Sequence, residues 1–553
     1  MTAVTRRRRA PAFALATLLA TGSATAAHAQ ASPPAWTRGA TCYEVFVRSF
    51  QDSDGDGIGD IKGLISRLDY INDGHSDPHT SLGARCIWLM PVAASPSYHG
   101  YDVADYYRVE PAYGTNADFA RLVAEAHRRG IHVLVDMVLN HSSSEHPYFK
   151  AALRDPASEY RAWYRWASRK PSELNPWGQS NWHKSPVRDE YYYGFFSPRM
   201  PDLNYTNPAV RAEALKIARF WLKDMKVDGF RLDAVPYLVE EPNAIVHSPG
   251  THRVLRQYQA GLRRINPDVY TIGEVSDSTR PMLGYYPDQL VSYFAFEVAD
   301  SLIAAVRRGS AGGILAPALR LQHDAPRERW SPFLRNHDQP RTRSELGGDL
   351  ARARVAAVLL MSLPGMPYVY YGEEIGMTGV KPDERLRTPM QWGGAHEAGF
   401  TTGTPWESLQ PDSATVTVQS QEHDSTSLLS LYRRLVHLRA GNAALAHGVL
   451  VPMSASDTAF TAWARRDGDR VVWAIANLGA VERRDVKVTS AAGALPAGHW
   501  LARDLLGIGP AFLFDVDPDG ALRDAAQLPA LGPRDARLYE LVRAIPPRRN
   551  SSH

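Results

Sequence analysis

Two residues of opposite charge stand two positions apart at the end of one apolar stretch. Val227–Asp233 reads VDGFRLD, and Arg231 and Asp233 share one face if this stretch is a β-strand. A fixed guanidinium beside a carboxylate holds that carboxylate ionised and oriented. An ionised, oriented Asp can attack as the nucleophile of a retaining glycosidase does. A purely structural ion pair would give the same pattern, so the interpretation depends on how the other strands end.

Two further predicted strands also end in acidic residues. Val269–Val275 (VYTIGEV) carries Glu274, and Pro332–Asp338 (PFLRNHD) carries Asp338. Two carboxyl groups about 5–5.5 Å apart hydrolyse a glycoside with retention, one attacking while the other protonates the leaving oxygen. We expect Glu274 to be that acid and Asp338 to hold sugar hydroxyls and the positive transition state. We expect His141 and His337 to be neutral donors to hydroxyl groups.

These residues meet only if the strands close into a ring. Helical patterns separate eight apolar stretches, and this alternation predicts an α/β fold, a parallel (β/α)8 TIM barrel. In such a barrel the chemistry lies at the carboxyl ends of the strands. The eight stretches are Tyr43–Phe50, Ile87–Pro91, Ile131–Asn140, Val227–Asp233, Val269–Val275, Val291–Phe296, Pro332–Asp338 and Met366–Tyr371.

Two regions depart from this alternation. Residues 142–205 are rich in Trp, Tyr, Pro and Ser and are far longer than a normal βα loop, which predicts a subdomain inserted after strand 3. The barrel is then formed by residues 30–141 and 206–443. Short alternating strands predict a C-terminal antiparallel β-sandwich domain over residues 444–542, with a polar tail over 543–553.

The N-terminus has the organisation of an export signal. Arg6–Arg9 are followed by apolar Ala10–Ala20 and an A-x-A site at Ala27–Ala29, so residues 1–29 are predicted to be a signal peptide. The apolar run is too short for a membrane anchor. We expect a secreted or periplasmic monomer without a membrane span. Losing four Arg takes the net charge from +3 to −1, which argues against a nucleic-acid partner.

The chain has two cysteines, Cys42 and Cys86, and each directly precedes a predicted strand. If these are the first two barrel strands, the thiols lie on neighbours about 5 Å apart. Export would permit a disulfide. Of the two arrangements, we favour two separate buried thiols.

An acidic, glycine-rich loop follows the first predicted strand. Carboxylates at two-residue spacing repel one another unless a cation is present, and oxygen ligands on a flexible turn suit Ca²⁺. The twelfth position is Gly63 rather than Glu, so the loop is not an EF-hand. We expect a structural Ca²⁺ ion. Mg²⁺ is the alternative cation, and a solvated acidic turn without a bound cation is the other interpretation. The expected ligands are Asp52, Asp54, Asp56, Asp60 and the carbonyl of Ile58.

An ordered set of motifs resembles the α-amylase family of glycoside hydrolases, family 13. The motifs are DMVLNH (Asp136–His141), MPDLN (Met200–Asn204), GFRLD (Gly229–Asp233), GEV (Gly273–Val275) and FLRNHD (Phe333–Asp338). The resemblance implies retaining hydrolysis of α-glucosidic bonds, with Asp233 as nucleophile, Glu274 as acid/base and Asp338 as transition-state stabiliser. It also implies that Tyr101, His141, Arg231 and His337 surround the cleaved glucose.

Finer features place the chain near the intermediary group between the oligo-1,6-glucosidase and neopullulanase subfamilies. MPDLN resembles that group, and SPSYHGYDVADYY and YYGEEIGM resemble its exported bacterial α-amylases. An exported enzyme would degrade starch or maltooligosaccharides. The stretch GFRLDAVPYL is also similar to trehalose synthases, and Asp102 with Arg387 is similar to a pair that clamps the substrate end in exo-acting α-glucosidases. We expect an exported α-amylase. The alternatives are an exo-acting α-glucosidase, a trehalose-synthase-like enzyme and a non-catalytic glucan-binding protein.

Overall fold

Eight parallel strands form the centre of the molecule in the computed structural model, which describes residues 32–394 and 396–544. Their order is β12-β11-β10-β9-β5-β2-β1-β13. The ring closes where the amide of Tyr368 donates to the carbonyl of Pro332 at 2.9 Å. The predicted TIM barrel is confirmed. The strands are β1 (Cys42–Val45), β2 (Cys86–Leu89), β5 (His132–Met137), β9 (Gly229–Leu232), β10 (Tyr270–Gly273), β11 (Ser292–Phe294), β12 (Trp330–Ser331) and β13 (Tyr368–Tyr370).

Alternate residues along these strands belong to two different apolar clusters. Cys42, Trp88 and Leu134 belong to one cluster, whereas their neighbours Ile87 and Val133 belong to the other. This division follows from the two-residue period of a strand, which points successive side chains to opposite faces. The larger cluster packs the sheet against the surrounding helices, and the smaller one fills the barrel interior.

Two strand predictions were wrong in extent. Tyr43–Phe50 was predicted as one strand, but β1 ends at Val45 and a helical turn, α1 (Val47–Phe50), follows. Most residues of this stretch are buried, so the apolar pattern could not distinguish a strand from a buried turn. Pro332–Asp338 lies beyond β12, which ends at Ser331. Pro332 has no amide hydrogen for a ladder bond.

Helices surround the barrel. Thr115 and Asp118 form a capping box at the start of α4, and Asn207 caps α6 with Pro208 at its first position. The helical stretch after the acidic loop is divided at Arg67 into two short helices. The larger helices are α4 (Asn116–Arg128), α6 (Pro208–Arg219), α7 (Pro249–Ile265), α9 (Phe296–Arg308), α10 (Ala316–Asp324), α12 (Leu350–Met361) and α15 (Leu428–Gly441). The shorter ones are α2 (Ile61–Ser66), α3 (Leu68–Ile71), α8 (Thr279–Leu283), α11 (Thr342–Glu345), α13 (Asp383–Leu386), α14 (Val418–Gln421) and α16 (Ala443–His447).

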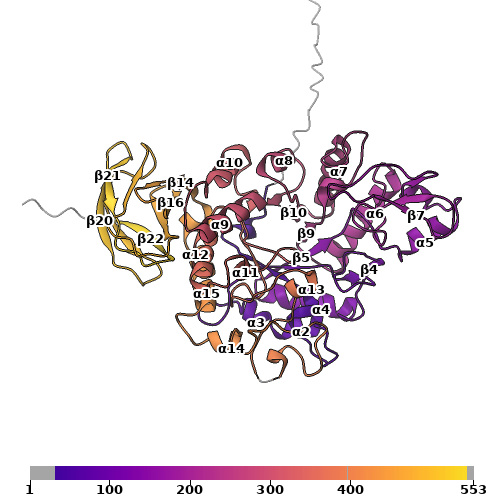
Figure 1. Cartoon of the computed structure of the whole chain (residues 1–553), viewed down its shortest axis with the longest axis horizontal. Helices are drawn as coiled ribbons and strands as arrows, with labels where there is room; N and C mark the ends of the chain where they lie inside the picture. The colour runs from indigo at the N-terminus through magenta and orange to yellow at the C-terminus, as the bar shows by residue number, and fades with distance from the viewer. Residues whose placement is uncertain (1–31, 395, 545–553) are drawn as a thin grey trace, which may run out of the picture.

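A small three-stranded sheet interrupts the barrel between β5 and α6, at the place predicted for an insertion. Its order is β6-β8-β7, and it packs with the helix α5. It lies at one end of the long axis of the molecule (Figure 1). Several of its aromatic side chains form small cores, as in the cluster of Phe149, Tyr164 and Tyr192. The elements are α5 (Pro147–Arg154), β6 (Trp166–Ala167), β7 (Trp182–Lys184) and β8 (Tyr191–Tyr193).

The opposite end of the long axis is formed by antiparallel sheets (Figure 1). A six-stranded sheet, β14-β16-β17-β22-β19-β20, and a three-stranded sheet, β15-β18-β21, share one apolar core. This confirms the predicted antiparallel C-terminal domain. Its last strand extends to Arg543, one residue past the predicted end of that domain. The strands are β14 (Val449–Pro452), β15 (Ser454–Ala455), β16 (Phe460–Asp467), β17 (Arg470–Asn477), β18 (Lys487–Ser490), β19 (Gly498–Asp504), β20 (Phe512–Val516), β21 (Leu522–Gln527) and β22 (Asp535–Arg543).

Cys42 and Cys86 form a disulfide, so the expectation of two separate thiols was wrong. The two residues are register partners on the neighbouring strands β1 and β2, and both lie in the cluster that fills the barrel. Sequence placed both at strand starts, but only the register shows that they are directly opposite each other.

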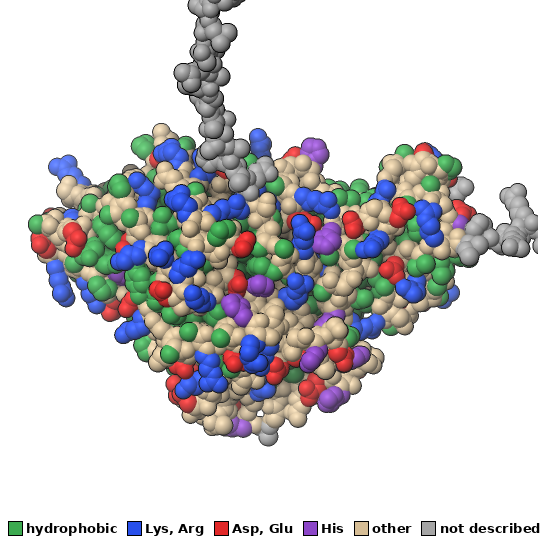
Figure 2. All heavy atoms as spheres, turned by 180° about the vertical axis from the view of Figure 1, so that it is seen from behind, with side chains coloured by type: hydrophobic (Ala, Val, Ile, Leu, Met, Phe, Trp, Pro, Cys, Tyr) green, Lys and Arg blue, Asp and Glu red, His purple; other side chains and the backbone are tan. Residues whose placement is uncertain are grey.

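The surface carries charges of both signs. On the face opposite to that in Figure 1, basic and acidic side chains are interspersed with apolar ones (Figure 2). Within residues 32–394 and 396–544, no helix combines the length and apolar character needed to cross a membrane. The predicted signal peptide, residues 1–29, lies outside the described residues.

Candidate active site

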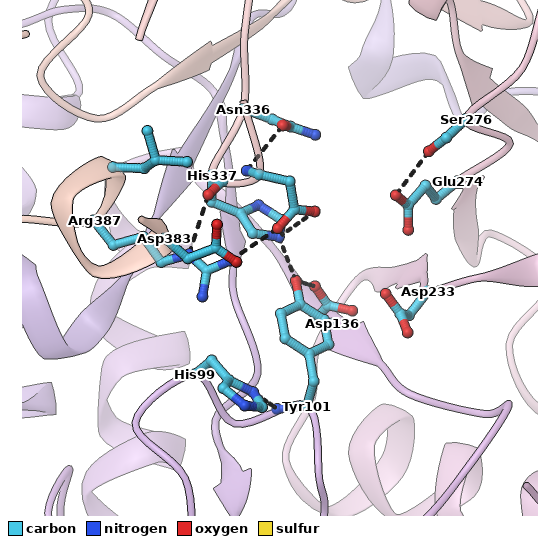
Figure 3. Close-up of polar contacts among 12 residues, drawn as sticks. His99, Tyr101, Asp136, Asp233, Glu274, Ser276, Asn336, His337, Asp383 and Arg387 are labelled. Atoms are coloured by element: carbon cyan, nitrogen blue, oxygen red, sulfur yellow. Dashed lines mark hydrogen bonds and ion pairs between the residues drawn. The ribbon is translucent and has the colours of Figure 1, made fainter. Parts of the chain in front are cut away.

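Residues from separate strands converge at one rim of the barrel. Asp233 directly follows β9, and Glu274 directly follows β10. The amide of Asp233 donates to the carbonyl of Met137 at 3.2 Å, and the amide of Glu274 donates to that of Leu232 at 3.0 Å. These bonds extend the ladder past the strand ends and fix both carboxylates on rigid backbone. Figure 3 shows the two side chains close together, with Tyr101 and Asp136 beside them.

Arg231 binds three of the carboxylates. One terminal nitrogen, Nη1, lies 2.8 Å from Oδ1 of Asp233 and 2.8 Å from both oxygens of Asp136. The other, Nη2, lies 2.6 Å from Oε2 of Glu274. The predicted ion pair between Arg231 and Asp233 is therefore present. Because one planar guanidinium contacts both Asp233 and Glu274, their carboxyl groups are held close together in a fixed orientation.

Burial and crowding of like charges govern the acid–base behaviour of this group. Burial raises the pKa of Asp136 to about 6, although the positive charge of Arg231 acts to lower it. Burial also raises the pKa of Asp233; Arg231 counteracts this rise, while Glu274 and Asp136 add to it. One guanidinium thus contacts three carboxylates, and the resting site favours retaining a proton among them.

Asp338 has a different electrostatic environment. Desolvation raises the pKa of Asp338, but His337 and then Arg387 outweigh this effect and hold that pKa well below its usual range. Nη2 of Arg387 lies 2.9 Å from Oδ1 of Asp338, and Nε2 of His337 lies 3.2 Å from Oδ2. Asp338 therefore remains ionised and is available to polar groups in the cleft.

His337 is not the neutral donor that we expected. Burial lowers its pKa, but Asp338 and Glu44 outweigh burial and raise it to about 9. Nδ1 of His337 lies 2.5 Å from Oε1 of Glu44, a buried carboxylate on β1. With both ring nitrogens protonated, Nε2 also donates to the hydroxyl of Tyr101 at 2.6 Å. His141 does match the expectation, since burial lowers its pKa to about 4.

Asp102 and Arg387, which are similar to a substrate-clamping pair, have different partners within the protein. Asp102 is buried and accepts hydrogen bonds from the hydroxyls of Ser95 and Ser97. Arg387 instead contacts Asp338 and, at 3.5 Å, Asp383. Sequence resemblance could not identify Asp383 as a partner of Arg387, because Asp383 begins the short helix α13, which lies outside the quoted motifs.

Two cavities adjoin at the carboxylates. One has a volume of about 390 Å³ and is lined by Tyr101, His141, Asp233, Glu274 and Arg387, among others. The other, of about 500 Å³, has Asn336 and Gln339 in its wall. Glu274, Ser276 and Asp338 line both cavities. The barrel rim therefore carries a continuous hollow with acidic groups at its middle.

The comparisons with known proteins agree with this geometry. The family model described as Alpha amylase, catalytic domain, matches residues 44–448. The chain belongs to the alpha-amylase family. Alpha-amylase 3 of Dictyoglomus thermophilum is 36% identical over 452 residues, covering 81% of this chain and 86% of that protein. Trehalose synthase/amylase TreS of Mycobacterium tuberculosis is 34% identical over 498 residues, covering 79% and 81%.

A solved structure described as alpha-amylase from H. orenii superposes with a TM-score of 0.78 at 37% identity. It covers 91% of this chain and 99% of that one. Membership of the alpha-amylase family supports a retaining glycosidase and a glucan substrate. The family relatives bear different names, so the comparisons do not decide between amylase and related activities.

Sequence reasoning missed two residues of this alpha-amylase-family site. Asp136 lies inside the quoted motif DMVLNH, and it is the register partner of Arg231 on the next strand. Its signal in the sequence is its place inside that motif, near the end of a predicted barrel strand. Glu44 lies alone on β1 among apolar residues, and nothing in its sequence neighbourhood indicates that it contacts His337.

The acidic loop after β1 presents part of the predicted ligand set. Ligand oxygens of Asp52, Asp54 and Asp60 lie within 4.8 Å of one another. Asp56 lies outside this group, and its carboxylate accepts the amide of Ile58 at 2.7 Å. Among the described residues, the ion pairs of the structure involve none of these four aspartates. Three carboxylates without a basic partner fit a hard divalent cation such as Ca²⁺ or Mg²⁺.

Proposed function

We propose that this protein is an exported α-amylase that hydrolyses internal α-1,4-glucosidic bonds of starch and maltooligosaccharides. The observation that carries the proposal is the shared guanidinium of Arg231, which holds Asp233 and Glu274 together in the wall of one cavity. This arrangement suits a double displacement, in which both carboxyl groups must reach the same glucosidic bond.

In the first step, a carboxylate oxygen of Asp233 bonds to the anomeric carbon and the glucosidic C–O bond breaks. Glu274 gives its proton to the departing oxygen. In the second step, Glu274 takes a proton from water, the water oxygen bonds to the anomeric carbon, and Asp233 is released. Asp338 stays anionic beside Arg387 and His337, and its charge stabilises the positive transition state.

Support for endo action comes from the hollow on both sides of the carboxylates. Cavity volumes of about 390 and 500 Å³ adjoin at Glu274 and Asp338, which leaves room for glucosyl units on either side of the cleaved bond. An exo-acting enzyme would instead need a wall at one end of the substrate.

The second candidate, an exo-acting α-glucosidase, is favoured by one cluster. Arg387 and Asp383 line the first cavity beside Asp338. Arg387 is similar to one residue of the pair that clamps the substrate end in exo-acting α-glucosidases, although α-amylases of the intermediary group carry similar residues. Maltoheptaoside blocked at its non-reducing end separates the two candidates. Cleavage of the blocked substrate supports endo action, whereas cleavage only of the unblocked substrate supports the exo alternative.

The catalytic assignment is tested by reducing-sugar release from soluble starch. Wild type should release sugar and Asp233→Ala should not, while Asp469→Ala, which changes an exposed carboxylate of the C-terminal domain, should match wild type. Equal release by Asp233→Ala would remove Asp233 from the mechanism. Absence of release by wild type on every glucan tested would favour a binding role.

Export is supported by the disulfide between Cys42 and Cys86, since such bonds persist in oxidising compartments. Sequencing the N-terminus of protein recovered from the medium or the periplasm should give a start near Gln30. Recovery only from the cytoplasm, with the leader intact, would contradict export.

A further inference from the structure

A tryptophan of the inserted segment lies exposed in the wall of the active-site cavity. The side chain of Trp177 is 59% exposed, and Trp177 lines the same cavity as Asp233 and Glu274. Among the large hydrophobic side chains exposed in the described residues, it is the one aromatic. A single exposed hydrophobic side chain needs no explanation by itself, so the informative observation is that this indole stands in the wall of the cavity that holds the carboxylates.

The loop that carries Trp177 is held in a defined shape. Asn175 is buried, and its side-chain oxygen accepts the amides of Trp177 at 3.1 Å and Gln179 at 2.9 Å. The amide of Asn175 donates to the carbonyl of Gln179 at 2.8 Å, and Gly178 takes a positive φ of 78° at the turn. A turn with this many internal bonds presents the indole in one place.

Neighbouring rings connect this indole to the nucleophile strand. The ring of Trp177 meets Phe195 edge-on at 5.6 Å and lies 6.1 Å from Phe196. Phe195 packs on Tyr237 at 4.3 Å, and Tyr237 lies four residues after Asp233. The position of the indole relative to Asp233 is therefore fixed both through its own turn and through these aromatic contacts.

We propose that Trp177 is a platform on which a glucosyl unit of the substrate stacks, beyond the unit that is cleaved. An aromatic face matches the C–H face of a glucose ring, and an indole offers the largest such face of any side chain. The platform acts on substrates long enough to reach it, so Trp177 sets a preference for longer chains. This inference rests on the proposed glucan-hydrolysing function.

The test compares Trp177→Ala and Trp177→Phe with wild type on maltoheptaose and on maltotriose. Aromatic contacts of this kind correspond to a change of roughly two- to twelvefold in binding. Trp177→Ala should raise KM for maltoheptaose by about that factor. The kcat of this variant and its kinetics on maltotriose should stay close to those of wild type. Trp177→Phe should recover most of the loss, because it keeps an aromatic face.

Leu174→Ala is the matched control, since Leu174 is 53% exposed on the same loop. Its kinetics should equal those of wild type on both substrates. Melting curves establish that each variant is folded. If Trp177→Ala is not folded, the test uses Trp177→Phe and a titration of that variant with maltoheptaose. Equal KM values for wild type and Trp177→Ala, or an equal loss on both substrates, would overturn the platform. Wild type that hydrolyses no glucan would instead overturn the proposed function.

Discussion

Asp136 and Arg231 are direct register partners on the neighbouring strands β5 and β9, and their side chains form an ion pair at 2.8 Å. Both side chains are almost wholly buried. Arg231 is thereby fixed from one side before it contacts Asp233 and Glu274 from the other. The barrel register thus sets the positions of the two groups that we assign to catalysis.

Changing Asp136 to Asn removes a negative charge that raises the pKa of Asp233. Because Asp233 attacks only when ionised, a lower pKa lets it act at lower pH. The acid limb of the kcat/KM profile should therefore move to lower pH, by about half a unit to one unit. The value of kcat should fall, since Arg231 loses a partner that orients it.

Asp300→Asn is the control for this change. Asp300 lines the second cavity and pairs with Arg335 rather than Arg231. Its pH profile should keep the acid limb of wild type. An unmoved acid limb in Asp136→Asn would show that Asp136 does not influence the ionisation of the nucleophile.

A second prediction concerns Glu373, a buried carboxyl group that accepts hydrogen bonds from Thr342 and Tyr432. Burial raises its pKa to about 7. A carboxyl with a raised folded-state pKa stabilises the fold below its unfolded pKa, and this contribution is lost as pH rises through the folded value. Stability should fall between about pH 4.5 and pH 7, by an amount on the order of 3 kcal/mol.

Glu373→Gln cannot ionise, so its unfolding free energy should vary less over that pH window than that of wild type. Chemical denaturation at a series of pH values measures the difference. Parallel curves for the two proteins would exclude Glu373 as the titrating group.

The disulfide gives a third prediction. Cys42 and Cys86 are separated by 44 residues, and a cross-link closing a loop of that length stabilises a fold by about 2–4 kcal/mol. The double variant Cys42→Ala, Cys86→Ala should melt below wild type but keep its activity at low temperature, since both positions lie at the starts of their strands, away from the catalytic rim. A melting temperature equal to that of oxidised wild type would contradict this.

The acidic loop gives a fourth prediction. If a divalent cation binds at Asp52, Asp54 and Asp60 only in the folded state, chelation with EDTA should lower the melting temperature of wild type. Asp54→Asn should melt like chelated wild type and should not respond to EDTA. Added Ca²⁺ and Mg²⁺, tested separately, should restore wild type to different extents. A wild-type melting curve that EDTA leaves unchanged would count against a cation at this loop.

Sequence predicted the barrel because strand period and helix period alternate along the chain, and a residue next to a strand end must lie at the rim. That reasoning placed Asp233 and Glu274 correctly. It could not predict contacts that depend on the register between strands, such as the disulfide or the pair of Asp136 with Arg231. It also misjudged the charge of His337, because Glu44 lies 293 positions away in sequence.

The central claim is that Asp233 forms the covalent bond to the sugar, and trapping that bond tests it most directly. Wild type treated with a slow, fluorine-substituted α-maltosyl fluoride should lose activity as one maltosyl group becomes attached. Mass spectrometry of the digested protein should place this group on the peptide that contains Asp233, and Asp233→Ala should remain unlabelled. Attachment at another residue, or unchanged activity with no attachment, would contradict the account.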